Sequence, residues 1–278
     1  MATVVKNSIP ILYADDLVLV CRGKNPIIIQ TLLQEDVVSI HNWCVTNRMT
    51  PNIAKTKSMW FVDNHKLENT RGLKLELNGH VLGEVNELKY LGIWLDRDLR
   101  FKKQLEHLDN QVGLRLMQLK KNRAYLNQAD AIVLYKHAIV PILEYGNFIV
   151  DSGPQTGIRR LQTQQNNGLR ICTRSKVIDI SINQLHKTCK VARLETRRKK
   201  QLACLMYRHT TNPENCVIQR NRTRSDKKVK MKVERPHREK YRKGPLYRGM
   251  LIWDELDCYI QDAETVDQFK TKIASIIK

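Results

Sequence analysis

The first hundred positions alternate between short apolar and polar stretches, a pattern that predicts strands and a single helix. Apolar runs over residues 9–12 and 17–21 predict two strands joined by a turn. Apolar side chains then recur every three or four positions up to Trp43, which predicts an amphipathic helix that Asn25 caps and Pro26 begins. Further strands are predicted over residues 58–62, 73–77, 80–82 and 88–94, the middle two joined by the hairpin signal Asn78-Gly79. The order of elements predicts an α+β fold, with helices on one face of an antiparallel sheet.

From about residue 98 onward, the pattern changes to helix alone. Four apolar stripes at helical spacing begin at residues 105, 131, 158 and 194, and the second is expected to break at Pro141. Residues 216–242 hold few apolar side chains and are expected to form a flexible basic linker, while apolar periodicity returns at 250–253 and 266–277. The predicted organisation is a mixed domain over residues 1–97, a helical region over 98–186, a basic region over 187–249 and a helical segment over 250–278.

Two neighbouring carboxylates, Asp15 and Asp16, occupy the turn between the first two predicted strands. Carboxylate oxygens are common protein ligands for Mg²⁺, with substrate phosphates completing the shell. The alternative is an ordinary solvated turn, because Asp favours turns and bonds to its own backbone there. The flanking runs are too apolar for an ordinary surface hairpin. We therefore expect strands that are at least partly buried, with a candidate Mg²⁺ site at their tip.

Positive charge is concentrated in one part of the chain, which carries a net charge of +20 overall. Residues 187–249 contain 21 Lys and Arg against five acids, a net charge of +16. An unbalanced basic block indicates a polyanionic partner, most often nucleic acid, whereas a solvated helix face carries both signs. A membrane surface is the weaker alternative, because residues 221–232 lack the apolar face of an interfacial helix. The candidate nucleic-acid contacts are Arg197, Arg198, Lys199, Lys200, Lys227 and Lys228.

Composition narrows the class of protein further. With 278 residues, of which 42% are hydrophobic, the chain can bury a sizeable core. No apolar run is long enough to cross a bilayer, and the opening residues do not resemble a signal peptide, so we expect an intracellular protein. The run from Arg197 to Lys200 could serve nuclear import or belong to a nucleic-acid surface. The seven cysteines form no CxxC pair, so neither a disulfide framework nor a standard zinc site is indicated.

Several motifs follow one another in an order that resembles a known family. The tetrapeptide Tyr13-Ala14-Asp15-Asp16 and the later segment Tyr90-Leu91-Gly92 with residues 93–96 are similar to two palm motifs of the reverse transcriptases of LINE-type (non-LTR) retrotransposons. Further segments that resemble the family lie at residues 43–57, 134–146, 161–170, 253–256 and 269–270. The resemblance covers nearly the whole chain. It implies a partial polymerase palm over residues 1–97, an all-α thumb over 98–186 and a basic C-terminal helical region.

The resemblance implies an RNA-directed DNA polymerase, which copies an RNA template by joining a DNA primer's 3′-hydroxyl to a dNTP with the help of Mg²⁺. Asp15 would be the principal metal ligand and Asp16 its neighbour at the catalytic centre, with Tyr13 near the primer terminus. Lys55 would contact the nucleotide phosphates or protonate the leaving pyrophosphate, although an exposed loop lysine looks the same in sequence. The residues that would position the primer end are Tyr90, Leu91 and Gly92, where the alternative is an ordinary buried strand with a tight turn.

The chain departs from the family at its beginning. Reverse transcriptases hold a further metal-binding Asp on an upstream palm strand, and residues 1–12 contain no carboxylate. Two metal ions need carboxylates from both sides, so we expect a truncated polymerase that is inactive as it stands. The alternatives are a non-catalytic nucleic-acid-binding remnant and a remnant whose helices serve a protein partner. The apolar strand over residues 9–12 also lacks a neighbour on one edge, so the chain is expected to associate.

Overall fold

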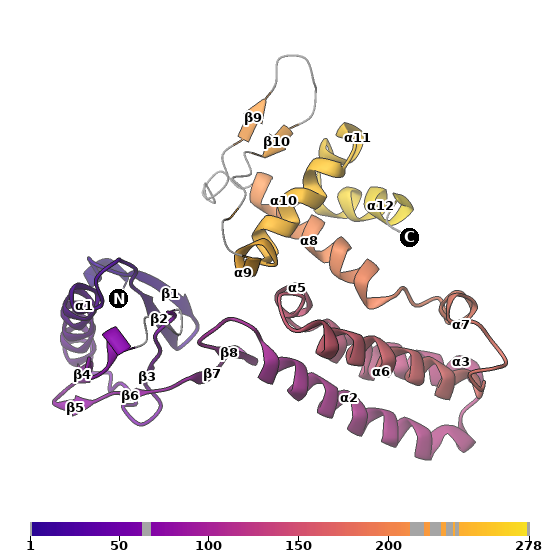
Figure 1. Ribbon diagram of the computed structural model, residues 1–278, viewed down its shortest axis with the longest axis horizontal. Helices are drawn as coiled ribbons and strands as arrows, with labels where there is room; N and C mark the ends of the chain where they lie inside the picture. Colours follow the sequence, from indigo (N-terminus) through magenta and orange to yellow (C-terminus); the bar gives the residue numbers. More distant parts are fainter. Residues whose placement is uncertain are drawn as a thin grey trace. The chain divides into compact units, whose positions relative to one another are not determined.

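The computed structural model describes residues 2–62, 68–211, 220–222, 229–231, 236 and 239–276. The chain divides into two compact units, Met1–Leu99 and Arg100–Lys278. The first combines one long helix with short strands, and the second is mostly helical (Figure 1). Each unit contains its own hydrophobic clusters. This combination of small sheets and many helices is that of an α+β protein.

The strands of the first unit form separate pairs instead of the single sheet that the sequence predicts. The antiparallel pairs are β1 (Ile9–Tyr13) with β2 (Asp16–Val20), β4 (Glu76–Leu77) with β5 (His80–Val81), and β7 (Glu87–Tyr90) with β8 (Ile93–Asp96). A parallel pair joins β3 (Lys57–Ser58) to β6 (Gly83–Glu84). The expectation of one continuous sheet is therefore wrong for the described residues. Strands of only two residues offer too few backbone groups to build a wider sheet.

The segment predicted as one strand over residues 88–94 is a hairpin. Strands β7 and β8 close on the pair Tyr90 and Ile93, which leaves Leu91 and Gly92 as a two-residue turn. Both turn residues have positive φ, 45° for Leu91 and 79° for Gly92. Tight hairpins favour this backbone, although a leucine seldom adopts it. The apolar residues on either side of the turn conceal it in the sequence.

The long helix α1 (Pro26–Thr46) begins as the sequence predicts. The side-chain oxygen of Asn25 accepts a hydrogen bond of 2.9 Å from the backbone N–H of Ile27, and Pro26 stands at the first helical position. On one side of α1, the small hydrophobic cluster of the first unit buries Leu75, Leu77 and Leu82 around the predicted Asn78-Gly79 turn. The expected hairpin is confirmed, with shorter strands than predicted.

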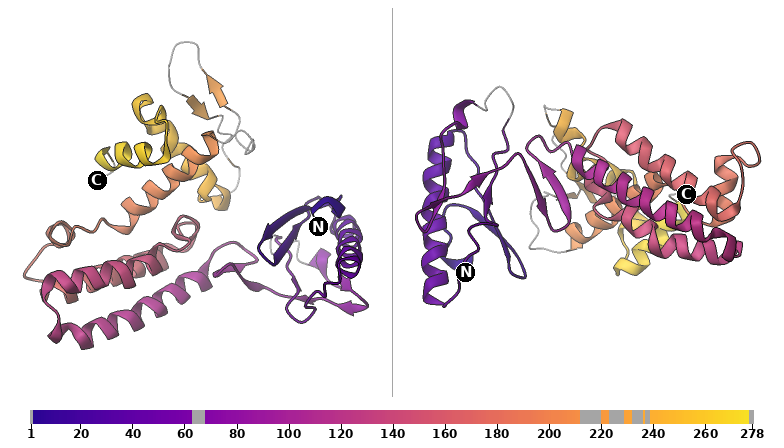
Figure 2. Two further views of the ribbon diagram at one scale, coloured as in Figure 1. Left: turned by 180° about the vertical axis from the view of Figure 1, so that it is seen from behind. Right: turned by 90° about the horizontal axis from the view of Figure 1, so that it is seen from below.

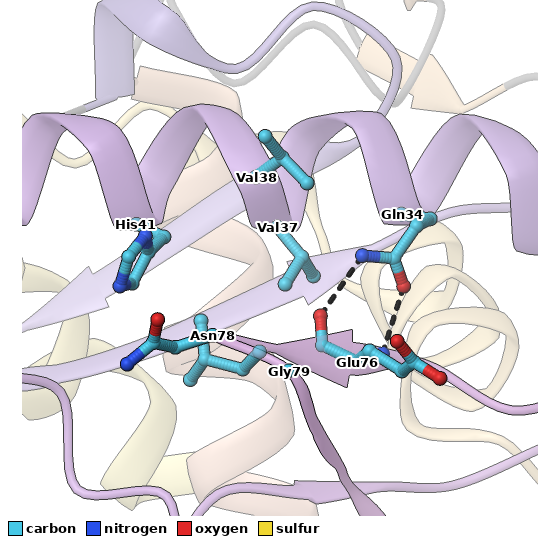
Figure 3. Close-up of a pocket in the computed structure, with 8 residues that line it drawn as sticks. Gln34, Val37, Val38, His41, Glu76, Asn78 and Gly79 are labelled. Atoms are coloured by element: carbon cyan, nitrogen blue, oxygen red, sulfur yellow. Dashed lines mark hydrogen bonds between the residues drawn. The ribbon is translucent and has the colours of Figure 1, made fainter.

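Two amide side chains of α1 hold this hairpin and the segment before it against the helix. The backbone N–H of Glu76 donates to Gln34 Oε1 over 2.8 Å, and Gln34 Nε2 donates to the carbonyl of Glu76 over 2.9 Å (Figure 3). Gln30 Nε2 donates to the carbonyl of Lys74 over 2.7 Å. These amides satisfy backbone groups that a neighbouring strand would otherwise pair. Val37, Val38 and His41 line the shallow pocket beside the hairpin.

The second unit is built mostly from helices. In chain order they are α2 (Lys102–Asn122), η3 (Arg123–Tyr125), α3 (Gln128–Ala138), α4 (Val140–Glu144), α5 (Asn147–Val150), α6 (Gln155–Thr173), α7 (Ile182–Cys189), α8 (Leu194–Thr211), α9 (Glu239–Arg242), α10 (Pro245–Glu255), α11 (Cys258–Gln261) and α12 (Val266–Ile276). A strand pair, β9 (Arg220–Arg222) with β10 (Val229–Met231), lies between α8 and α9. None of the described helices is long and apolar enough to span a membrane.

The predicted stripes form the first core of this unit. Helix α2 buries the whole of its stripe, which consists of Leu105, Leu108, Val112, Leu116 and Leu119. Helices α2, α3 and α6 lie side by side in Figures 1 and 2. The second stripe is interrupted at Ile139, two residues before Pro141, as expected. Gly168 allows α6 to approach α3, because a Cβ there would lie 2.4 Å from Cε2 of Tyr135.

Helix α8 joins the two cores of the second unit. Leu194 at its start is buried in the first core, whereas Met206 and Tyr207 near its end are buried in the second. In the second core, the ring of Phe269 stacks on those of Tyr207 and Trp253, at centroid distances of 4.6 Å and 6.0 Å. The expected terminal helices over 250–253 and 266–277 are confirmed as α10 and α12. Most of the expected linker over residues 216–242 lies outside the described residues.

Candidate functional site

The Asp15-Asp16 pair lies at the tip of the β1–β2 hairpin. The closing pair of this hairpin is Tyr13 with Asp16, so Ala14 and Asp15 form a two-residue loop. Ala14 has φ of 52°, in the left-handed region that a residue with a side chain seldom adopts. Both carboxylates are exposed, and so is Tyr13. Tight two-residue hairpin loops favour this backbone, and Asn78 and Leu91 adopt it in the other two antiparallel hairpins of the first unit.

The strands below this tip are more exposed than the sequence predicts. On β1, the side chains of Ile9, Ile11 and Leu12 are 49%, 46% and 47% exposed. None of the buried clusters among the described residues includes a residue of β1 or β2. The expectation of buried flanking strands is therefore wrong for β1. A hairpin of two strands has no second layer of its own, so its apolar side chains remain in contact with solvent.

A buried carboxylate on α1 fixes the segment that leads into β1. Asp36, only 1% exposed, accepts hydrogen bonds from the backbone N–H groups of Lys6 (2.9 Å) and Asn7 (3.0 Å) and from the hydroxyl of Ser8 (2.7 Å). Burial raises the pKa of Asp36, but these hydrogen bonds outweigh it and hold the pKa below its usual value. Asp36 thus positions residues 6–8, which lead into the β1–β2 hairpin. Its signal in the sequence is an acid on the apolar face of a helix, beside Leu32, Leu33 and Ile40.

The two turn carboxylates supply a partial donor set for a metal ion. Neither the Asp15 nor the Asp16 carboxylate makes a hydrogen bond or ion pair with a described residue, so their oxygens are available to a ligand. Carboxylate oxygens of this kind suit Mg²⁺. Within the described ranges, no third acid, His or Cys joins them in a group that could hold a metal ion. By themselves, Asp15 and Asp16 therefore supply only some of the ligands that a Mg²⁺ site needs.

The other expected site residues of the first unit lie on two further segments. Lys55 is exposed on the loop between α1 and β3, where its backbone N–H donates to Asn52 Oδ1 over 3.1 Å. No hydrogen bond or ion pair between described residues joins its ammonium group to Asp15 or Asp16. The expected primer-positioning residues Tyr90, Leu91 and Gly92 form the β7–β8 turn described above. Their roles remain predictions.

Most of the predicted basic contacts on α8 are engaged in ion pairs. Arg198 is only 5% exposed, and its Nε lies 2.6 Å from Oδ1 of Asp151. Arg197 pairs with Glu144, and Lys199 pairs with Glu195 one turn away over 3.0 Å. Lys200 is partly exposed on the same helix.

The guanidinium of Arg198 faces the protein interior, so the expectation that it contacts nucleic acid does not fit this arrangement. Asp151 explains the difference, because it lies 47 positions away in sequence and bonds Arg248 as well. Lys227 and Lys228 lie outside the described residues.

No family model matches the chain. It is similar to "Probable RNA-directed DNA polymerase from transposon BS" of Drosophila melanogaster, with 29% identity over 167 residues that cover 58% of this chain and 18% of that protein. It is also similar to "RNA-directed DNA polymerase from mobile element jockey" of Drosophila funebris, with 24% identity over 161 residues that cover 57% of this chain and 17% of that protein.

A third relative is "Probable RNA-directed DNA polymerase from transposon X-element" of Drosophila melanogaster, with 28% identity over 110 residues that cover 38% of this chain and 12% of that protein. The matched segments make up less than a fifth of each of these curated relatives. The expected relationship to polymerases of non-LTR retrotransposons is confirmed by these similarities.

Proposed function

We propose that this chain, a relative of the RNA-directed DNA polymerases of non-LTR retrotransposons, is a nucleic-acid-binding part of such a polymerase. The observation that carries the proposal is the similarity to these polymerases over 58% of the chain. The net charge of +20 supports it, because a strongly basic protein attracts a polyanion. An RNA template, a DNA primer and dNTP are then the partners of the whole enzyme.

The β1–β2 turn would hold Mg²⁺ through Asp15 and Asp16. When bound, the ion would stabilise the charge that develops on the transferred phosphoryl group. The chain's own contribution is to present two carboxylates on an exposed turn, at the tip of a hairpin whose leading segment Asp36 holds against α1. The exposed side chain of Tyr13 lies next to this turn and would be the candidate contact for the primer terminus. Lys55 is the candidate contact for nucleotide phosphates.

We propose further that this chain does not extend a primer by itself. A two-ion centre clamps both the attacking and the leaving oxygen, so its carboxylates must converge from more than one segment. Asp15 and Asp16 are neighbours on a single turn. Additional polypeptide must therefore complete the catalytic centre.

Primer extension on an RNA template tests this proposal. The purified chain should incorporate no more nucleotide than the Asp15→Ala variant. Robust incorporation that is lost in Asp15→Ala would show that the centre is complete and would refute the claim of inactivity. Metal binding has a separate readout, which is the broadening of the amide NMR signals of residues 13–16 by Mn²⁺. Broadening should occur in the wild type and disappear in the Asp15→Asn, Asp16→Asn double variant.

The second candidate function is nucleic-acid binding without any link to catalysis. The partial donor set at the turn favours it among the described residues. The two candidates differ in one measurement. If a polypeptide that contains the upstream region of a related polymerase is added, the first candidate predicts restored incorporation that depends on Asp15. The second predicts nucleic-acid binding with no incorporation under the same conditions.

A further inference from the structure

The outer face of α6 carries a continuous polar and basic stripe. The stripe consists of Arg160, Thr163, Asn167, Arg170 and Arg174. At about 100° per residue the first four positions fall within roughly 80° of the helix circumference, and Arg174 follows as the C-cap of the helix, with φ of 55°. The buried face of the helix, with Leu161, Gln165 and Cys172 among others, lies on the opposite side. Packing against α2, α3 and α7 therefore leaves the stripe in contact with solvent.

The cations of this stripe are not neutralised by carboxylates. Arg170 Nη1 donates to the carbonyl of Lys176 over 2.9 Å, and Arg174 Nη2 donates to the carbonyl of Arg123 over 3.0 Å. Neither these two nor Arg160 forms an ion pair with a described residue. Residues 152–178 contain no acid at all. On α8, in contrast, Arg197, Arg198 and Lys199 are all paired with acids.

An exposed aromatic ring lies at the end of the stripe. The guanidinium of Arg123 donates to the carbonyls of Ile171 (2.9 Å) and Cys172 (2.7 Å) at the C-terminus of α6, which fixes η3 to the end of that helix. Tyr125, in the same short helix, is 88% exposed. In Figure 1 the connection between α2 and α3 and the end of α6 lie at the same end of the helical layer. A solvent-facing tyrosine thus belongs to the same short helix as Arg123, whose carbonyl accepts a hydrogen bond from Arg174.

The simplest alternative explanation is that these arginines complement the helix dipole. Cations favour the C-terminus of a helix, which would account for Arg170 and Arg174. It does not account for Arg159 and Arg160, which lie in the N-terminal half of α6, where the dipole disfavours positive charge. Nor does it account for the exposure of Tyr125. The arrangement instead combines unpaired cations along one line with an open aromatic face.

We propose that the α6 stripe and Tyr125 bind a single strand of nucleic acid. Arg160, Arg170 and Arg174 would contact successive parts of the phosphate backbone, and a base would stack on the ring of Tyr125. Arginine groups along a line and exposed aromatic rings are the two features that single-strand-binding surfaces combine. Arg160 and Arg170 are ten residues apart on α6, roughly 15 Å along the helix axis, and Arg174 follows at its C-terminus. The class of partner rests on the proposed function, but the surface is assigned by the geometry of α6.

Two triple variants of the full chain test the assignment. The first, Arg160→Gln, Arg170→Gln and Arg174→Gln, removes three positive charges from the stripe. The matched control, Lys187→Gln, Arg208→Gln and Lys270→Gln, removes three positive charges from exposed positions on α7, α8 and α12. Fluorescence anisotropy with a labelled single-stranded oligonucleotide measures the affinity of each. Circular dichroism and thermal melting establish that both variants are folded like the wild type.

The stripe variant should bind at least 10-fold more weakly, and the slope of log affinity against log salt should fall by about 2, because each lost phosphate contact contributes about 0.7. The control variant should change the affinity by less than about 3-fold, as expected for exposed charges away from the contact. Equal losses in the two variants would mean that net charge alone governs binding and would overturn the assignment. A larger loss in the control would show that the binding surface lies away from the α6 stripe and would overturn the assignment as well.

Tyr125 has its own test. Tyr125→Ala should weaken binding by roughly 5- to 100-fold, the range for loss of one base stack, while Tyr125→Phe keeps the ring and should bind like the wild type. Unchanged binding by Tyr125→Ala would contradict the single-strand assignment even if the stripe variant is weakened. If the wild type itself does not bind the oligonucleotide at low salt, the proposed function fails together with this inference. Wild-type binding with equal losses in both triple variants leaves the proposed function standing and refutes only the α6 surface.

Discussion

The anchor between Asp36 and the segment before β1 gives the sharpest prediction for the first unit. Asp36→Ala removes the acceptor of two backbone N–H groups and of the Ser8 hydroxyl. A hydrogen bond to a charged group contributes about 1.5–3 kcal/mol, and water can reach the partly buried donors once the carboxylate is gone. The free energy of opening the segment that leads into β1 should therefore fall by about 2–4 kcal/mol, and β1 should open locally more often. Ser8→Ala removes one of the three bonds and should cost only about 1 kcal/mol.

Backbone amide exchange of the full chain, followed peptide by peptide, is the appropriate assay. Residues 6–20 should exchange faster in Asp36→Ala, while the helices of the second unit should exchange as in the wild type. Unchanged exchange over residues 6–20 would refute the view that Asp36 holds the hairpin in place. The Ser8→Ala variant serves as the matched control, because it leaves the carboxylate and both backbone bonds intact.

The same anchor has a pH dependence whose direction follows from its pKa. The pKa of folded Asp36 is held below its usual value, which is about 3.9 in an unfolded chain. The stabilisation is therefore present above about pH 4 and is lost as the pH falls through the lower, folded pKa. Amide exchange over residues 6–20 should accelerate in that acidic window relative to other segments, after correction for the intrinsic rate. Asp36→Asn should lack this extra acceleration, and if it shows the same acceleration, another acid is responsible.

Three further substitutions test the packing and surface of the molecule. Gly168→Ala should lower the free energy of unfolding in urea by about 1–3 kcal/mol, because the new Cβ would clash with the ring of Tyr135. Gly113→Ala should not lower it, because the nearest neighbour of its new Cβ lies 3.9 Å away. Equal free energies of unfolding for the two variants would contradict the close approach of α6 to α3. Asp151→Asn should lower the free energy of unfolding by about 3–5 kcal/mol, because it leaves the guanidinium groups of Arg198 and Arg248 without their counter-charge. Glu195→Gln breaks the exposed ion pair with Lys199 and should lower it by at most about 1 kcal/mol. A similarly small loss of stability in both variants would show that the ion pairs of Asp151 with Arg198 and Arg248 do not hold α8 and α10 together. Ile11→Lys should reduce self-association of the chain through β1, as measured by sedimentation velocity. Val133→Lys on α3, at a position of similar exposure, should not reduce it. A wild-type chain that stays monomeric at high concentration would contradict the view that the exposed edge of β1 causes association.

Local signals in the sequence account for much of the fold. Periodicity and capping chemistry specify the Asn25 cap, the stripe of four leucines and one valine on α2, and the interruption near Pro141. Each of these features depends on neighbours within one or two helical turns. The turn at Leu91-Gly92 was missed because its first residue is apolar and adopts positive φ only within the hairpin. Helix α7 was missed because eight residues provide too little periodicity to stand out from a loop.

The candidate site was predictable in part for the same reason. The position of Asp15 and Asp16 on a turn follows from the two flanking apolar runs. Whether those runs are buried depends on what packs on them, and a pattern of residue types does not specify that. The pairing of Arg198 with Asp151 joins positions far apart in sequence, so a run of basic residues on α8 could not reveal that its charges are already neutralised. The unpaired arginines of α6 became apparent only from their common face and the absence of carboxylates around them.

The salt dependence of nucleic-acid binding by the wild-type chain tests the central claim most directly. Affinity for a labelled single-stranded RNA should be measured between about 50 and 200 mM salt. Three or more phosphate contacts predict a slope of log affinity against log salt of about −2 or steeper, at roughly −0.7 for each contact. No measurable binding at the lowest salt, or an affinity that hardly changes across the range, would contradict the account that this chain is a nucleic-acid-binding part of a polymerase.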